Sequence, residues 1–187
     1  KMREAEAGPY EHLALRKDGT RLPVEVQSRS FDSGERRLRV TSIRDMTGRK
    51  AAEESYRASE ERLRATIENT PYVAVQWYDL QGKILFWNQA SEAMFGWKSS
   101  EALGKTLHQL IHTPAEAAGF VKLLGEIEAT GQPAGPNEYN FRRRDGTEGV
   151  CLSTTFRIPT GTGQFCFVCM DVDITETIKA RRHQAGQ

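Results

Sequence analysis

The sequence lacks the marks of a membrane-spanning or secreted protein and has almost no net charge. No run approaches the roughly 18 consecutive apolar residues of a transmembrane helix, and there is no signal-peptide pattern. The 26 Lys and Arg residues balance 25 Asp and Glu residues, which leaves a formal net charge of +1. This balance excludes a strong general attraction to nucleic acid and gives no reason to expect direct membrane contact.

Cysteine is scarce. Cys151, Cys166 and Cys169 are an odd number in apolar surroundings, which indicates a reducing, cytoplasmic compartment. Cys166 and Cys169 form a C-x-x-C pattern, but residues three apart on a strand point to opposite faces. We interpret both as buried small side chains and expect no metal site. Because the first residue is Lys1 rather than Met, we expect a fragment of a longer protein that could be membrane-anchored elsewhere.

Catalytic motifs are missing as well. The sequence contains no phosphate-binding glycine loop, no nucleophile elbow and no His/Asp/Glu cluster with metal-ligand spacing. His183 could suggest the phosphoacceptor of a histidine kinase, but the Glu-Leu-Arg-Thr-Pro context of that family is absent after it. We therefore expect no catalytic residue in this chain.

The most informative feature is an internal repeat. Residues 13–20 reappear 127 positions later as residues 140–147, and residues 44–47 reappear 128 positions later as residues 172–175. One inserted residue in the second copy reconciles the two offsets, so the copies share a three-strand module. Each copy contains Asp-Gly between two strand-like runs, which predicts a tight hairpin with positive φ at both central residues.

A helical connector is predicted over residues 48–69, between the two copies. Its apolar and small side chains recur every three or four positions at Ala52, Tyr56, Ser59, Leu63 and Ile67. This narrow stripe is typical of a seam shared by two helices, and equally of one amphipathic helix packed on its own domain.

The rest of the chain reads as strands separated from helices. Strands are predicted over 73–78, 84–87, 138–143, 149–158 and 164–173, with short helices after Asn88. Thr113 to Glu116 form a capping box with proline at the first helical position, and Gly131 ends that longest helix. The order predicts an antiparallel α+β domain with helices on one face of the sheet.

Several stretches, in this order, resemble the PAS family (the PAS/PAC sensory box). They are residues 59–65 and 69–71, 79–88, 95–97, 144–147 and 173–175. The resemblance is complete over 62–175. Residues 1–47 resemble, from residue 10 onward, only the C-terminal strands of a preceding, incomplete PAS domain, whose missing part lies either upstream or on a neighbouring chain.

The resemblance implies a five-stranded antiparallel sheet with a ligand cavity between the sheet and its helices. It also implies a homodimer in a bacterial signalling receptor, such as a two-component system, with signals passing through the helices that enter and leave the domain. The final Asp173 and Thr175 would anchor the exit signalling helix, 176–187, to the sheet. The downstream effector domain in the same polypeptide would be a histidine kinase or a cyclic-dinucleotide enzyme.

Side chains at the matching positions disfavour the usual cofactors of this family. Leu107 stands where the light-sensing LOV branch carries its reactive cysteine, which excludes flavin photochemistry. Phe141, Cys151 and Asp171 replace the amides that contact flavin, so bound flavin is disfavoured too. Haem is disfavoured because the start of the long helix has no histidine, with only His108 and His112 just before it. A small organic ligand remains.

The inner face of the sheet follows from the resemblance and from the strand period of two. The predicted cavity residues are Gln76, Tyr78, Phe95, Leu107, Phe120, Leu124, Tyr139, Phe141, Cys151, Ser153, Thr155 and Asp171. Such a lining suits a small polar or cationic ligand. Because a buried carboxylate is costly, Asp171 should meet a cation, a ligand donor or an internal partner such as Ser153, Thr155 or Tyr78.

The opposite face of the sheet is unusually apolar. Strands with one solvated face should alternate apolar side chains toward the core with polar side chains toward solvent, and these strands do not. We expect the face to be covered by the connector or by a second subunit, through Leu63, Ile67, Val150, Leu152, Val168 and Met170. The leading hypothesis is therefore a PAS sensor and dimerisation module, and the second is a ligand-free PAS protein-interaction module.

Overall fold

The computed structural model describes residues 8–161 and 163–185 of the chain. The chain divides into two compact units, residues 1–62 and residues 63–187, which are described separately below. Among the described residues, no helix is both long enough and apolar enough to cross a membrane.

The second unit is built on a five-stranded antiparallel sheet. Its strands lie in the order β5-β4-β8-β7-β6. They are β4 (Ala74–Tyr78), β5 (Ile84–Trp87), β6 (Ala134–Arg142), β7 (Glu148–Pro159) and β8 (Phe165–Asp173). The sequence placed β6 four residues too late, because a register shift between Ala134 and Asn137 interrupts its pairing.

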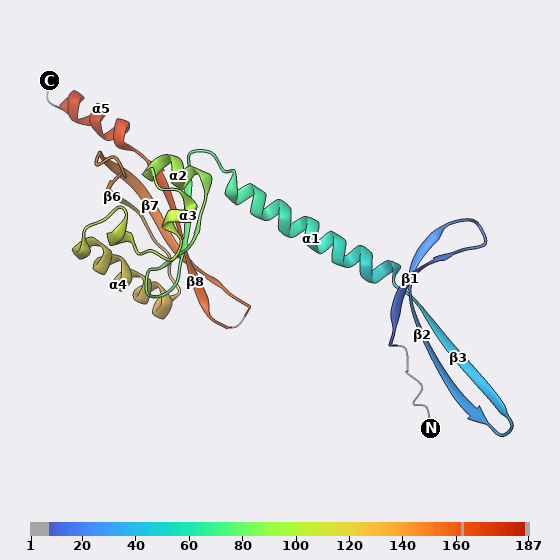
Figure 1. Cartoon of the computed structure of the whole chain (residues 1–187). Coiled ribbons are helices and arrows are strands. Elements are labelled where there is room, and N and C mark those ends of the chain that lie inside the picture. Colours follow the sequence, from blue (N-terminus) through green and yellow to red (C-terminus); the bar gives the residue numbers. More distant parts are fainter. Residues whose placement is uncertain (1–7, 162, 186–187) are drawn as a thin grey trace. The chain divides into compact units, whose positions relative to one another are not determined.

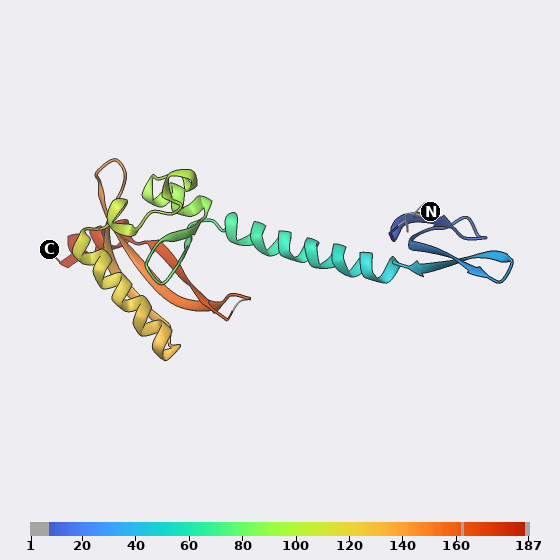
Figure 2. The same cartoon turned by 60° about the horizontal axis from the view of Figure 1, so that its bottom comes forward.

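Helices cover one face of this sheet (Figures 1 and 2). They are α2 (Gln89–Phe95), α3 (Ser99–Ala102), the 3-10 turn η1 (Leu107–Gln109) and α4 (Pro114–Thr130), and α5 (Thr175–Ala185) leaves the domain after β8. The predicted α+β fold, a five-stranded antiparallel sheet with helices on one face, is confirmed.

The ends of α4 are fixed by its own sequence. The backbone N–H of Thr113 donates to Glu116 Oε2 at 2.8 Å, and the N–H of Glu116 donates back to the Thr113 hydroxyl at 3.4 Å. Gly131 ends the helix in the left-handed region, with φ of +73°. The predicted capping box and glycine stop are both confirmed, because each depends on neighbours within one turn.

Asn88 ties the start of α2 to the sheet and to the preceding helix. Its side-chain oxygen accepts from the N–H groups of Val75 and Ser91, each at 2.9 Å. Its amide nitrogen donates to the carbonyls of Ile67 and Val73, each at 3.1 Å. The predicted helix cap is therefore also the centre of a buried polar network, which sequence reasoning did not anticipate.

The core lies between the sheet and the helices. Its largest fully buried side chains include Trp87, Tyr78, Phe95 and Phe167. Burying each such side chain contributes roughly 1.5–3 kcal/mol through the apolar area removed from water. The Trp87 indole N–H also donates to the Trp97 carbonyl at 3.0 Å, so this buried donor is satisfied.

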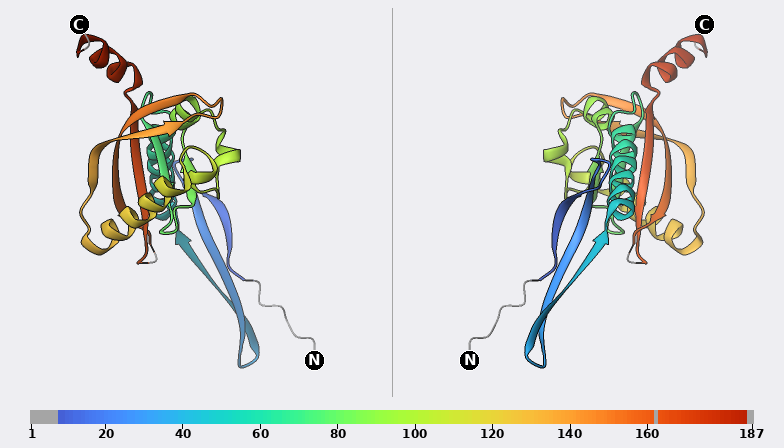
Figure 3. Two further views of the ribbon diagram at one scale, coloured as in Figure 1. Left: turned by 90° about the vertical axis from the view of Figure 1, so that its left-hand side faces the viewer. Right: turned by 90° about the vertical axis from the view of Figure 1, so that its right-hand side faces the viewer.

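The first unit holds a three-stranded antiparallel sheet, β1 (Tyr10–Leu15), β2 (Arg21–Ser33) and β3 (Arg36–Asp45), followed by α1 (Thr47–Glu68), which continues into the second unit. β1 pairs only with the first half of β2, so β2 and β3 continue past it as a hairpin (Figure 3). Val24 and Met46 are buried, whereas Leu15 and Ile43 are 70% and 67% exposed.

The repeat inferred from sequence is a repeat of strand register. In the first copy Val24 pairs with Asp45, and in the second Cys151 pairs with Asp173. The single inserted residue lies in the loop between β7 and β8, because Asp32 pairs with Arg37 whereas Pro159 pairs with Phe165. The Ser28 and Thr41 hydroxyls, 2.8 Å apart, occupy the positions of Thr155 and Cys169, whose side chains are also bonded.

Both Asp-Gly hairpins form, but their predicted backbone is wrong. Only Gly19 and Gly146 have positive φ, +85° and +86°, and the aspartates before them do not. In the first hairpin Gly19 N–H donates to the Arg16 carbonyl and Arg16 N–H donates to the Thr20 carbonyl. The loop therefore has three residues rather than two, and such loops need only one left-handed residue.

The connector helix and the outer face of the sheet are covered to different extents within the single chain. α1 contains no buried residue, and Leu63 is 64% exposed. On the outer face Val168 is buried, and Val150 and Leu152 are half-buried, whereas Met170 remains 39% exposed. Part of this face is therefore covered by the domain's own side chains.

Trp77 is one of the domain's own side chains on this outer face. It pairs with Val168 across β4 and β8, and its ring centroid lies 4.9 Å from that of Phe86. Sequence reasoning omitted both aromatic residues from the outer face, because it extended the period-two alternation only along β7 and β8.

Candidate functional site

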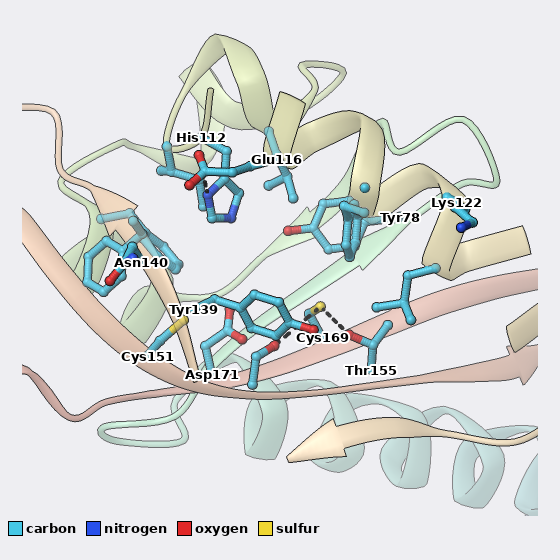
Figure 4. Close-up of a pocket in the computed structure, with 18 of the residues that line it drawn as sticks. Tyr78, His112, Glu116, Lys122, Tyr139, Asn140, Cys151, Thr155, Cys169 and Asp171 are labelled. Atoms are coloured by element: carbon cyan, nitrogen blue, oxygen red, sulfur yellow. Dashed lines mark hydrogen bonds and ion pairs between the residues drawn. The ribbon is translucent and has the colours of Figure 1, made fainter. Parts of the chain in front are cut away.

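A cavity of about 470 Å³ lies between the sheet and α4. Its walls come from β4, β6, β7 and β8 on the sheet side, and from α2, η1 and one face of α4 on the helix side. Figure 4 shows Asp171, Cys151, Cys169 and Thr155 on the sheet, facing His112 and other helix-side groups. The volume is within the range of small-molecule sites, roughly 300–1,000 Å³.

Ten of the twelve side chains predicted to line the cavity do so. They are Tyr78, Phe95, Leu107, Phe120, Tyr139, Phe141, Cys151, Ser153, Thr155 and Asp171. The other two, Gln76 and Leu124, are fully buried in the core and do not line it. The Gln76 amide donates to the Ser91 hydroxyl at 2.9 Å, which holds the side chain against α2.

Sequence reasoning missed the polar groups at the mouth of the cavity. These groups are His112, Glu116, Lys122, Glu126 and Asn140. All but Asn140 lie on or just before α4, and the charged ones are exposed. The spacing of Glu116, Lys122 and Glu126 along one helical face was a usable signal, but which face turns toward the sheet depends on tertiary packing.

Asp171 is a buried carboxyl group in the floor of the site. Its side chain lies in the sheet floor and is 6% exposed. Burial raises the pKa of Asp171 to about 6, although hydrogen bonding with Ser153 and Gln76 opposes this rise. Both of these partners are neutral, and no salt bridge involves Asp171 among the described residues. Of the internal partners that we considered, Ser153 lowers the pKa of Asp171, whereas the Thr155 hydroxyl lies 2.9 Å from the Cys169 sulfur instead.

Three other titratable side chains of the cavity are held neutral near pH 7. Burial raises the pKa of the Cys151 and Cys169 thiols, so neither is a reactive thiolate. Burial lowers the pKa of His112, with a smaller opposing effect of Glu116. The buried Nδ1 of His112 lies 3.7 Å from Glu116 Oε2, beyond hydrogen-bond distance, and makes no hydrogen bond. Nucleophilic chemistry therefore has no candidate among these groups.

The start of the exit helix is fixed to the sheet by a short polar chain. Asp173 Oδ1 accepts from the Thr175 N–H at 2.9 Å, and the Thr175 hydroxyl accepts from the Val150 N–H at 3.0 Å. Arg143 Nη2 donates to Asp173 Oδ2 at 2.6 Å. Although burial alone would raise the pKa of Asp173, the hydrogen bonds from Thr175 and Arg143 lower it overall.

Arg143 also reaches the cavity wall. Its guanidinium lies 4.8 Å from the centroid of the Phe141 ring, and its Nε donates to the Met94 carbonyl at 3.1 Å, in the last turn of α2. Gly149 makes this arrangement possible, because a Cβ there would lie 2.4 Å from Phe141. The first unit repeats the polar chain. Arg16 donates to the Asp45 carboxylate, which in turn accepts from the N–H of Thr47 at the start of α1.

The second unit is therefore an α+β module with a cavity between its antiparallel sheet and its helices, and with its exit helix anchored at the end of the last strand. Residues 61–172 match the family described as PAS fold, and residues 1–48 match a second family described as PAS domain. The chain belongs to the PAS family. PAS domains are regulatory sensory modules rather than catalytic domains.

Solved structures agree with this assignment. The PAS domain of an HTR-like protein from Haloarcula marismortui is 25% identical, with a TM-score of 0.58, over 67% of this chain and 99% of that one. A PAS domain from Colwellia psychrerythraea is 25% identical, with a TM-score of 0.53, over 62% of this chain and 97% of that one. VqmA of Vibrio cholerae shares the fold, at 20% identity and a TM-score of 0.53, over 62% of this chain and 52% of that one. No curated protein matches the chain.

Proposed function

We propose that this chain is a PAS sensor and dimerisation module, which relays the state of its cavity to an output domain in the same polypeptide. A histidine kinase and a cyclic-dinucleotide enzyme are the two candidate output domains. In this proposal the chain binds and transmits, and the catalytic chemistry belongs to the output domain.

The observation that carries the proposal is the contact route from the cavity to the exit helix. Phe141 lines the cavity, Arg143 lies over its ring, and Arg143 also bonds Asp173, which holds Thr175 at the start of α5. A ligand that displaces the Phe141 ring would change the position of the guanidinium and therefore its bond to Asp173. This is a physical route by which occupancy could bias two arrangements of the exit helix.

Dimerisation is supported by apolar side chains that remain exposed in the single chain. Met170 and Val172 on the outer face are each 39% exposed, and Leu63 on α1 is 64% exposed. Apolar groups gathered on one face are typical of an association site. We propose a parallel homodimer that uses this face together with α1.

A ligand-free protein-interaction module is the second candidate. The observation that favours it is that Ser153 and Gln76, both neutral, already oppose the rise in the pKa of Asp171 without a ligand. In that case the cavity would hold only water.

Native mass spectrometry of the freshly purified protein tests the two candidates. We expect a small-molecule adduct on the wild type, and its absorption spectrum shows whether that adduct is haem or flavin. Gly119→Leu should remove the adduct, because Gly119 lines the cavity and a Cβ there meets nothing within 4 Å.

Gly125→Leu is the matched control, since Gly125 is on the same helix, is equally unobstructed and does not line the cavity. An adduct lost from both variants would place the ligand elsewhere. A wild type with no adduct, and with unchanged hydrogen exchange in α5 when Gly119 is filled, would favour the ligand-free module.

A further inference from the structure

We propose that the cavity binds a small organic cation, an amine whose protonated nitrogen is held by Asp171 against aromatic walls. This inference rests on the proposed sensor function and narrows it to one class of ligand. Three features of the cavity carry it: the carboxylate without a positive partner, the aromatic lining, and the charges at the mouth.

The carboxylate lacks a positive partner. Asp171 is 6% exposed, and its hydrogen-bond partners, Ser153 and Gln76, are both neutral. Burying an unpaired carboxylate costs several kcal/mol in general, and proteins normally offset this with a cation or with protonation. No described Lys or Arg side chain forms an ion pair with Asp171. A ligand ammonium group is therefore the partner that this position lacks.

The walls suit a cation better than a neutral polar group. The rings of Tyr78 and Phe120 lie 4.9 Å apart, edge to face, and those of Phe95 and Phe141 lie 5.1 Å apart in the same geometry. All four rings line the cavity. Aromatic faces attract ammonium groups through their quadrupole, and the attraction is stronger when the contact is desolvated.

The charged side chains at the mouth of the cavity also favour a cationic ligand. Glu116 and Glu126 line the cavity together with Lys122, whose ammonium lies 3.9 Å from Glu126. His112 adds no charge near pH 7, because burial lowers its pKa. Counting Asp171, three acids face one base, so the electrostatic potential favours a cation and opposes a carboxylate or phosphate.

The test compares three probes of one shape with the whole 187-residue chain: benzylamine, benzyl alcohol and benzoate. Isothermal titration at pH 7.5 should show benzylamine binding at least about tenfold more tightly than benzyl alcohol, with no detectable binding of benzoate. Asp171→Asn should weaken benzylamine binding at least about tenfold and leave benzyl alcohol unchanged. Glu128→Gln, an equal change of charge on α4 outside the cavity, should change neither.

The dependence on pH provides an independent signature. Asp171 binds the amine only when ionised, and its pKa is about 6 in the empty protein. Benzylamine affinity should therefore fall about tenfold from pH 7.5 to pH 5 in the wild type. Cys151 and Cys169, the other acids of the floor, stay protonated throughout. The pKa of Glu116 is lowered, so it stays ionised, and any charge that His112 gains at the acid end of this range would add to the fall.

Asp171→Asn separates these two contributions, because only the His112 part of the pH dependence should survive in it. The folded state of this variant is checked by circular dichroism before titration. Benzyl alcohol or benzoate binding as tightly as benzylamine would overturn the cationic class and leave a ligand-binding sensor intact. Failure of all three probes to bind at millimolar concentration would overturn the inference. The proposed sensor function would then be tested by the native mass spectrometry experiment alone.

Discussion

Asp171 makes the stability of the second unit depend on pH. Its folded-state pKa, about 6, is above its ordinary value of 3.8. The folded protein therefore holds a proton that the unfolded chain has already lost between these values, and stability falls as pH rises through this window. Below pH 4 this penalty is absent, and above pH 6 it is complete, at about 3 kcal/mol as an order of magnitude.

We therefore expect Asp171→Asn to stabilise the empty protein at pH 7.5, by up to about 3 kcal/mol, and to have little effect at pH 4. Urea unfolding followed by tryptophan fluorescence measures this, because Trp77, Trp87 and Trp97 all lie in the second unit. Glu128→Gln serves as the control. A stabilisation that is equal at pH 4 and pH 7.5 would contradict the raised pKa.

Two glycines allow a second comparison at the residue scale. A Cβ on Gly149 would lie 2.4 Å from the Phe141 ring, whereas a Cβ on Gly125 would meet nothing within 4 Å. Gly149→Ala should destabilise the domain by roughly 1–3 kcal/mol through overpacking. Gly125→Ala, inside α4, should stabilise it by roughly 0.5–1 kcal/mol through helix propensity.

Urea unfolding of both alanine variants measures these free energies. The opposite signs are the informative result, because both variants add the same single methyl group. A neutral Gly149→Ala would show that Phe141 can move freely from its place over β7.

The exit helix illustrates the element scale. Thr175 accepts from the Val150 N–H at 3.0 Å, and Asp173 accepts from the Thr175 N–H, so two strands and the helix meet at one polar chain. Thr175→Val should leave the Val150 N–H without its acceptor and cost about 1–3 kcal/mol. Hydrogen exchange should then speed up in α5 and at Val150.

Thr177→Val, two residues further along α5, is the matched control and should leave exchange near the wild-type rate. If exchange in α5 is unaffected by Thr175→Val, the helix is held by other contacts, and the route from Arg143 to Asp173 loses its place in the proposed relay.

Association belongs to the scale of the whole molecule. If the outer face joins two copies, Met170→Glu should introduce a charge into an apolar contact and weaken dimerisation at least about tenfold, measured by analytical ultracentrifugation. Leu103→Glu is the control, because Leu103 is similarly exposed, at 47% against 39%, but follows α3 on the helix side. A chain that sediments as a monomer at every concentration would contradict the dimer.

The repeat, the strand alternation and the helix caps could be predicted because each depends on residues that are close in sequence. Thr113 with Glu116 and the Asp-Gly hairpins are contacts within one turn of chain. The inner face of the sheet followed from a period of two and from the PAS resemblance, and ten of the twelve residues predicted from the sheet and the helices together line the cavity.

Only the tertiary structure decided what depends on how elements rotate and pack. It placed Glu116, Lys122 and Glu126 at the cavity mouth, because that depends on which face of α4 turns toward the sheet. It also withdrew Gln76 from the cavity, because its amide reaches Ser91 on α2. The sequence by itself determined the order of the strands, the places of the hairpins and the ends of α4, since those are local, whereas the shape and charge of the cavity arise where distant segments meet.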